Sequence, residues 1–109
     1  MLAITAIIRA KKGHEAAMHQ ALLDVVEHVR ANEPSTVGYY VSQDVDSPRI
    51  FSTYERYLDQ AAMDRHNNSL AVARFFEVAK PILDGEVIVV LANEIASKQG
   101  VGRSPPGHK

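Results

Sequence analysis

The fold of this 109-residue chain is constrained most by two strongly apolar runs, LAITAIIR at residues 2–9 and EVIVVLANEI at residues 86–95. Each run is rich in β-branched residues, which is typical of a strand. A sheet that is covered on one face should alternate apolar with polar residues. In both runs, however, the two faces are both largely apolar. We therefore expect a sheet that has both of its faces removed from water.

The region after the first run predicts a helix and then a β-hairpin. Residues 14–31 carry apolar side chains at steps of three and four, which is the helical period. Pro34 ends this helix, because a proline disfavours helical backbone in the residue before it. Residues 37–57 alternate apolar with polar residues on either side of a turn at residues 46–48, so they predict two antiparallel strands.

A second helical segment is predicted between the hairpin and the last apolar run. It begins near Leu58 and is interrupted at Asn67 and Asn68. Ser69 is suited to cap the helix that follows, and Pro81 is expected to kink or end that helix.

The resulting order, β-α-β-β-α-β, is the ferredoxin-like arrangement of the α+β class. It predicts a four-stranded antiparallel sheet, and because crossover connections are right-handed, both helical segments should lie on one face. The other face is apolar but uncovered, and large contiguous apolar patches are rare on monomers. We therefore expect a homodimer in which two sheets pack face to face around a two-fold axis.

Length and composition set the domain organisation and exclude several classes of function. We place one domain at residues 1–95 and expect residues 96–109, which lack periodicity, to be a disordered tail. A formal net charge of −1 without a basic stripe gives no electrostatic reason to bind nucleic acid. The absence of cysteine excludes disulfides and Cys-based metal sites. We recognise no signal peptide and no apolar run of the ~20 residues that span a bilayer, so we expect a cytoplasmic protein outside the membrane.

Three polar side chains near the middle of the chain are candidates for a functional site. Alternation along the strand at residues 50–57 puts Glu55 and Tyr57 on one face. The helix with His66 follows this strand directly, so it must fold back over the sheet. If it covers the face that carries Phe51, Glu55 and Tyr57, then Glu55, Tyr57 and His66 converge beneath it. The expected apolar walls of this pocket are Phe51, Met63 and Phe76. An apolar pocket with a few convergent polar groups is the usual form of a small-molecule site.

Three segments occur in an informative order: KKGHEAA after the first strand, ANEPSTVGYYV into the second, and IFSTYERYLDQAAMDRHNNS from the third strand into a helix. Together they resemble the antibiotic-biosynthesis monooxygenase (ABM) family, small dimeric ferredoxin-like proteins that include quinol monooxygenases. The resemblance covers about residues 1–95. It implies an enzyme that oxidises a small aromatic or quinol-type substrate with molecular oxygen, and that uses no metal, flavin or other cofactor.

The resemblance also assigns roles to individual residues. Glu55 and His66 occupy the family's Glu and His positions, whereas Tyr57 stands where the family has Trp and Ser35 where it usually has Gly. The resemblance implies that His66 is a general base. An imidazole suits this role because it titrates near neutral pH. Glu55 would then orient His66 or Tyr57, and Tyr57 would bond a substrate oxygen.

Structural interpretations of the same residues stay open. His66 could be a hydrogen-bonded core residue, Glu55 a structural carboxylate and Tyr57 a packing residue with its hydroxyl satisfied. Asp24 and His28 are four residues apart, but without a third ligand in view we expect a solvated helix face and no metal site.

Alternative functions also stay open. One is a non-catalytic dimeric module that binds a small molecule, and another is an isomerase-like reaction on the same fold. The haem-degrading branch of the superfamily matches less well, because it uses an early Asn where the first strand offers only Thr5, and a Trp, which this chain lacks.

Overall fold

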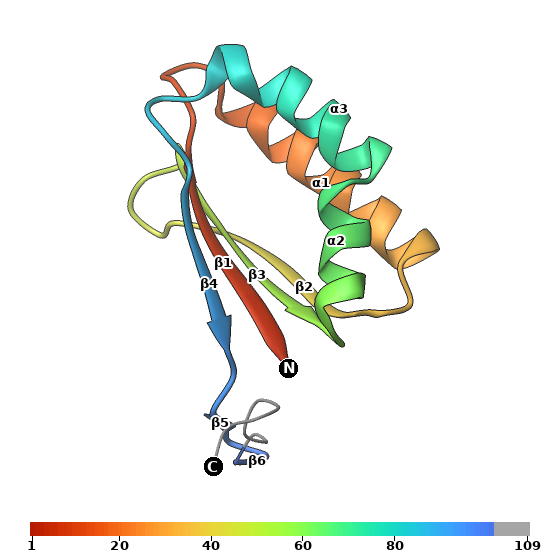
Figure 1. Ribbon diagram of the computed structural model, residues 1–109. Coiled ribbons are helices and arrows are strands. Elements are labelled where there is room, and N and C mark those ends of the chain that lie inside the picture. Colours follow the sequence, from red (N-terminus) through yellow and green to blue (C-terminus); the bar gives the residue numbers. More distant parts are fainter. Residues whose placement is uncertain (102–109) are drawn as a thin grey trace.

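The computed structural model describes residues 1–101, which form a sheet with helices on one face (Figure 1). The predicted order of strands and helices is present, with the second helical segment divided in two. The main elements are β1 Leu2–Arg9, α1 Glu15–Asn32, β2 Thr36–Gln43, β3 Ile50–Tyr57, α2 Gln60–Asn67, α3 Leu70–Ala79, the 3₁₀ turn η1 Lys80–Ile82 and β4 Ile88–Asn93. A short hairpin, β5 Ala96–Ser97 and β6 Gly100–Val101, follows β4. None of the helices in residues 1–101 is long and apolar enough to cross a membrane.

The sheet has the strand order β2-β3-β1-β4, and every neighbouring pair is antiparallel. Strands β1 and β4, which are far apart in the sequence, therefore lie side by side, and the hairpin of β2 and β3 extends the sheet beyond β1. Figure 1 shows α1, α2 and α3 on the same side of this sheet. The ferredoxin-like fold of the α+β class that the sequence predicts is confirmed.

The break between α2 and α3 is made by side-chain caps. Asp59 Oδ1 accepts a hydrogen bond of 2.9 Å from the backbone N–H of Ala62 at the start of α2. Ser69 Oγ accepts one of 3.2 Å from the N–H of Val72 at the start of α3, as the sequence predicts. Such caps satisfy amide groups that have no partner inside the helix. Because the Asp59 cap comes directly after β3, α2 turns back over the sheet at once.

The core consists of two clusters of buried side chains under the helices. The larger joins α1, α3 and the sheet, and the smaller lies under α2. Burying each large apolar side chain contributes about 1.5–3 kcal/mol to stability. The fully buried large residues are Met18, Leu22 and Phe51 in the first cluster and Tyr57 in the second.

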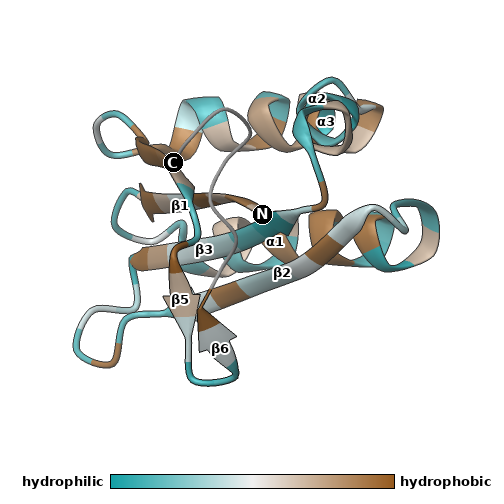
Figure 2. Ribbon diagram, turned by 60° about the horizontal axis from the view of Figure 1, so that its bottom comes forward, coloured by the Kyte–Doolittle hydropathy of each residue, from teal (hydrophilic) through white to brown (hydrophobic). Residues whose placement is uncertain are grey.

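The face of the sheet away from the helices carries large apolar side chains that are open to solvent. Ile88 and Val90 of β4 are 61% and 53% exposed, and Tyr40 and Tyr54 are 57% and 40% exposed. Val90 and Tyr54 both lie opposite Thr5 in the sheet register, and Tyr40 lies opposite Tyr54, so these side chains share one face. Figure 2 shows hydrophobic stretches along the strands as well as on the helices. This is the face that the sequence predicts to need a cover; the homodimer itself stays a prediction.

The end of β4 is tied to β3 by a polar network on the same outer face. Glu94 accepts hydrogen bonds from the Tyr54 hydroxyl at 2.5 Å and from Arg56 Nε and Nη2 at 2.7 and 3.0 Å. These bonds, those to Arg56 first, hold the pKa of Glu94 down at about 2. The hairpin of β5 and β6 follows, within the segment predicted to be a tail. The rest of that predicted tail, residues 102–109, lies outside the described residues.

Candidate functional site

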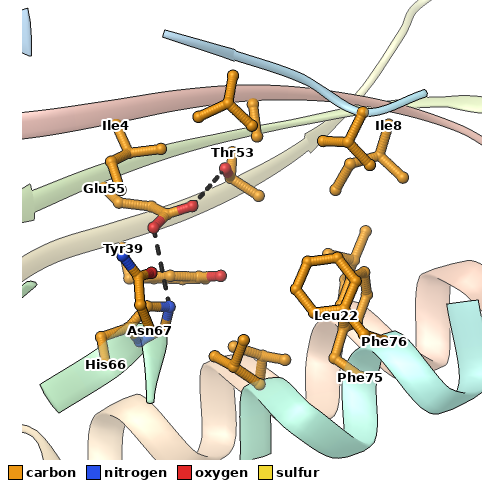
Figure 3. A pocket seen from close by; sticks show the side chains of 15 residues that line it. Ile4, Ile8, Leu22, Tyr39, Thr53, Glu55, His66, Asn67, Phe75 and Phe76 are labelled. Atoms are coloured by element: carbon orange, nitrogen blue, oxygen red, sulfur yellow. Dashed lines mark hydrogen bonds and ion pairs between the residues drawn. The ribbon is translucent and has the colours of Figure 1, made fainter. Parts of the chain in front are cut away.

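A cavity of about 280 Å³ lies between the sheet and the three helices, and its lining is mostly apolar. Figure 3 shows that the polar side chains gather towards one end of the cavity, where Ile4 also lies, while the other end is apolar. The apolar end is formed by Ile8, Leu22, Phe75 and Phe76. The polar end is formed by Tyr39, Thr53, Glu55, His66 and Asn67. The cavity can therefore hold an apolar body at one end and a polar group at the other.

Glu55 is a buried carboxylate with two close hydrogen-bond donors. Thr53 Oγ1 donates to Glu55 Oε2 at 2.6 Å, and the Tyr57 hydroxyl donates to Glu55 Oε1 at 2.5 Å. Because residues two apart in a strand share a face, β3 delivers all three side chains to the helix-covered side. The bonds compensate for removing the charge of Glu55 from water.

His66 stands between two carboxylates. Its Nδ1 is 2.9 Å from Glu33 Oε1, and its Nε2 is 3.8 Å from Glu55 Oε1. Its ring centroid also lies 5.2 Å from that of Tyr39 and 5.5 Å from that of Tyr57. The side chain is only 4% exposed. An imidazolium formed here would meet a negative charge near each of its ring nitrogens.

Both phenols of the site keep their protons at neutral pH. Burial raises the pKa of Tyr57 far above the usual range, and its hydrogen bond to Glu55 raises it further. Burial likewise raises the pKa of Tyr39, and the charges of Glu55 and Glu33 add to the effect. Neither phenol can act as a base, but both can donate a hydrogen bond.

The hydroxyl groups of Tyr57 and Tyr39 have different hydrogen-bond acceptors available to them. Tyr57 is fully buried behind Glu55 and donates to it. The Tyr39 hydroxyl has no hydrogen-bond partner within residues 1–101, and Figure 3 shows it pointing into the cavity. Tyr39 is therefore free to donate to a bound molecule.

The structure brings Glu55, Tyr57 and His66 together under α2, but only one of the three expected wall residues lines the cavity. Phe76 lines the cavity at its rim and is half exposed. Phe51 and Met63 are buried in the core and do not line the cavity. Phe51 is covered by α1, where its ring and that of His19 make an edge-to-face contact with a centroid distance of 6.3 Å.

Four polar residues of the site had no assigned role in the sequence analysis: Glu33, Tyr39, Thr53 and Asn67. Alternation along β3 puts Thr53 on the same face as Glu55, and alternation along β2 puts Tyr39 on the core side. The sequence pattern therefore indicated that these two side chains face the core. Glu33 is the C-cap residue of α1, and nothing in the sequence around it indicates that it reaches His66. Among residues 1–101, no group of three or more His, Cys, Asp or Glu side chains is placed to hold a metal ion.

Comparison with known proteins gives a family match and close structural similarity. A model of the family described as antibiotic biosynthesis monooxygenase matches residues 1–91. A solved protein described as an antibiotic biosynthesis monooxygenase is 25% identical, with a TM-score of 0.79 over 85% of this chain and 97% of that one. PA3566 from Pseudomonas aeruginosa is 28% identical, with a TM-score of 0.80 over 87% and 94%. Rv0793 from Mycobacterium tuberculosis, at 18% identity and a TM-score of 0.81 over 89% and 97%, shares the fold. No match was found among curated proteins.

Proposed function

Since the chain belongs to the antibiotic biosynthesis monooxygenase family, we propose that it is a monooxygenase that oxidises a small aromatic or quinol-type molecule with molecular oxygen and without a cofactor. One observation carries the proposal: His66 stands between two carboxylates at the polar end of an apolar cavity. Such a site can remove a proton from a bound molecule and surround the resulting anion mostly with apolar side chains.

The cavity sets the size and orientation of the substrate. Its volume of about 280 Å³ lies just below the ~300–1,000 Å³ typical of small-molecule pockets, which favours a molecule of one or a few fused rings. The rings would lie among Ile8, Leu22 and Phe75, and a hydroxyl or carbonyl oxygen would lie near Tyr39 and His66.

In the proposed reaction, His66 Nε2 takes a proton from a phenolic or activated carbon position of the substrate. Tyr39 donates a hydrogen bond to the oxygen on which negative charge develops. The electron-rich anion then reduces oxygen and combines with it. For a methylene carbon, both hydrogens leave as water with one oxygen atom, and the second oxygen atom forms the new carbonyl. The proton held by His66 returns during the release of water, so the base is regenerated.

The test is oxygen uptake by the purified full chain with a panel of quinols and anthrones. The His66→Ala variant is expected to lose about 10²–10⁴-fold in kcat, which is the usual contribution of a general base. His14→Ala, on the exposed start of α1, is the matched control and should not change the rate. A His66→Ala variant with an unchanged rate would reject the assignment of the base.

The same panel separates the two other functions. A ligand that raises the melting temperature without being converted would indicate a binding module. Conversion without oxygen consumption would indicate an isomerase-like proton transfer, which needs the same base and no oxidant.

We also propose that the protein is a homodimer joined through the outer face of the sheet. Exposed Ile88, Val90 and Tyr40 support it, because a monomer seldom leaves such a row of apolar side chains in water. Ile88→Lys should shift the protein from dimer to monomer in sedimentation at micromolar concentration, whereas Leu70→Lys, at an exposed apolar position of α3, should not. A wild-type protein that sediments as a stable monomer would reject the dimer.

A further inference from the structure

We propose that Glu33, and not Glu55, is the positioning residue for His66. In this proposal Glu33 holds the imidazole as the tautomer with its proton on Nδ1, so that the basic lone pair of Nε2 faces Glu55 and the cavity. The catalytic meaning of this arrangement rests on the proposed function, but the arrangement itself can be measured without any reaction.

Distance distinguishes the two carboxylates. Glu33 Oε1 is 2.9 Å from His66 Nδ1, which is a hydrogen bond, whereas Glu55 Oε1 is 3.8 Å from Nε2, which is too long for one. An ionised carboxylate can only accept hydrogen bonds, so the proton of this bond belongs to Nδ1. A neutral His66 then has an unprotonated Nε2.

The existing bonds of Glu55 support the same conclusion. Its two oxygens already accept hydrogen bonds from Thr53 and Tyr57, both of which come from β3. Glu55 is therefore held by two donors of its own strand, and at 3.8 Å from Nε2 it makes no hydrogen bond to His66. Its charge still lies on the Nε2 side of His66, where it stabilises an imidazolium once a proton has been taken.

Glu33 is built into place for this role. Thr36 Oγ1 donates to Glu33 Oε1 at 2.8 Å. The other oxygen, Oε2, lies 2.8 Å from His28 Nε2, a contact that is an ion pair when His28 is protonated but lacks the alignment of a hydrogen bond. The side chain is only 10% exposed. The carboxylate is thus fixed between α1, β2 and α2, and one of its oxygens is directed at His66.

Glu33 also lines a second cavity, of about 510 Å³, together with His28, Thr36 and Arg65. His66 does not line this second cavity, whereas Glu33 does not line the first. Glu33 therefore faces a cavity that is distinct from the proposed substrate pocket and has a more polar lining. A small carboxylate added to the solvent has a route to the position of Glu33 that avoids the substrate pocket.

The decisive measurement is the tautomer of His66, read from the ¹⁵N shifts of its ring nitrogens at a pH where the ring is neutral. The other titratable groups that face this ring are Glu33, Glu55, Tyr39 and Tyr57, with His28 behind Glu33. We expect a protonated Nδ1 and an unprotonated Nε2 in the wild-type protein. A proton on Nε2 would overturn the proposal. Because the measurement is made on the wild-type protein, it does not depend on whether a variant folds.

Glu33→Ala tests the same point in function. It should return His66 to a mixture of tautomers and lower kcat by about 10-fold or more, a smaller loss than that of the base itself. Added formate should restore part of the rate. Glu27→Gln, which removes the charge of an exposed glutamate in the helix that Glu33 caps, is the control and should change neither readout. An unchanged His66 tautomer in folded Glu33→Ala would refute the role of Glu33. If no substrate is ever oxidised, the ¹⁵N result still decides the positioning, so failure of the proposed function remains distinguishable.

Discussion

Replacing Tyr57 by Phe tests how the buried carboxylate is stabilised. The substitution removes one oxygen atom and nearly preserves the shape of the side chain, so it leaves almost no void. Tyr57 is fully buried, and its hydroxyl is one of two donors to Glu55. Hydrogen bonds to charged groups contribute about 1.5–3 kcal/mol, and a buried acceptor that loses its donor bears the full cost of desolvation.

We therefore expect Tyr57→Phe to lower the free energy of unfolding by about 2 kcal/mol. For a domain of this size that corresponds to a fall in melting temperature of roughly 10 °C. Urea unfolding at one fixed protein concentration gives the free energy, because the proposed dimer makes stability depend on concentration.

A double-mutant cycle with Glu55→Gln tests whether the stability lost in Tyr57→Phe comes from the charge of Glu55. A neutral amide needs the donor less than a carboxylate does, so Tyr57→Phe should cost clearly less in the Glu55→Gln background, with a coupling energy on the order of 1 kcal/mol. An equal cost in both backgrounds would refute the argument, because the loss would then come from packing and not from the charge.

Two other predictions concern stability and binding. Phe51→Ala empties a fully buried core position, so it should destabilise the protein by about 3–5 kcal/mol in urea unfolding. Phe76→Ala, at the half-exposed rim of the cavity, should cost under about 1 kcal/mol and mainly raise KM. Equal losses of stability in the two variants would contradict this placement. Arg56 and Tyr54 lower the pKa of Glu94 to about 2 from 4.5, so the stability from this network is present above about pH 4.5 and is lost as the pH falls towards 2. Acid titrations of unfolding should therefore be flatter over that range in Glu94→Gln than in the wild type, and parallel curves would show that the network contributes nothing.

Much of the fold follows from local patterns in the sequence. The apolar runs at both ends predict β1 and β4, the period of residues 14–31 predicts α1, and Ser69 caps α3 as predicted. The resemblance to the ABM family is confirmed by the match to residues 1–91. These features depend on the backbone preferences and spacing of neighbouring residues, which a sequence displays directly.

The site could be predicted only in part. Alternation along β3 and the immediate return of α2 suffice to bring Glu55, Tyr57 and His66 together. The same patterns do not distinguish a wall of the cavity from the core. Phe51 and Met63 face the right way but are covered, since the unfilled space depends on how side chains of distant elements fit.

The sequence by itself determined the order of strands and helices and which side chains of each element turn towards the helices, because spacing along one element fixes its faces. Only the tertiary structure decided which carboxylate reaches His66. Glu33 is 33 positions away in the chain, and its contact depends on how the end of α1 meets α2. No local pattern encodes that meeting, because it results from the packing of both helices on one sheet.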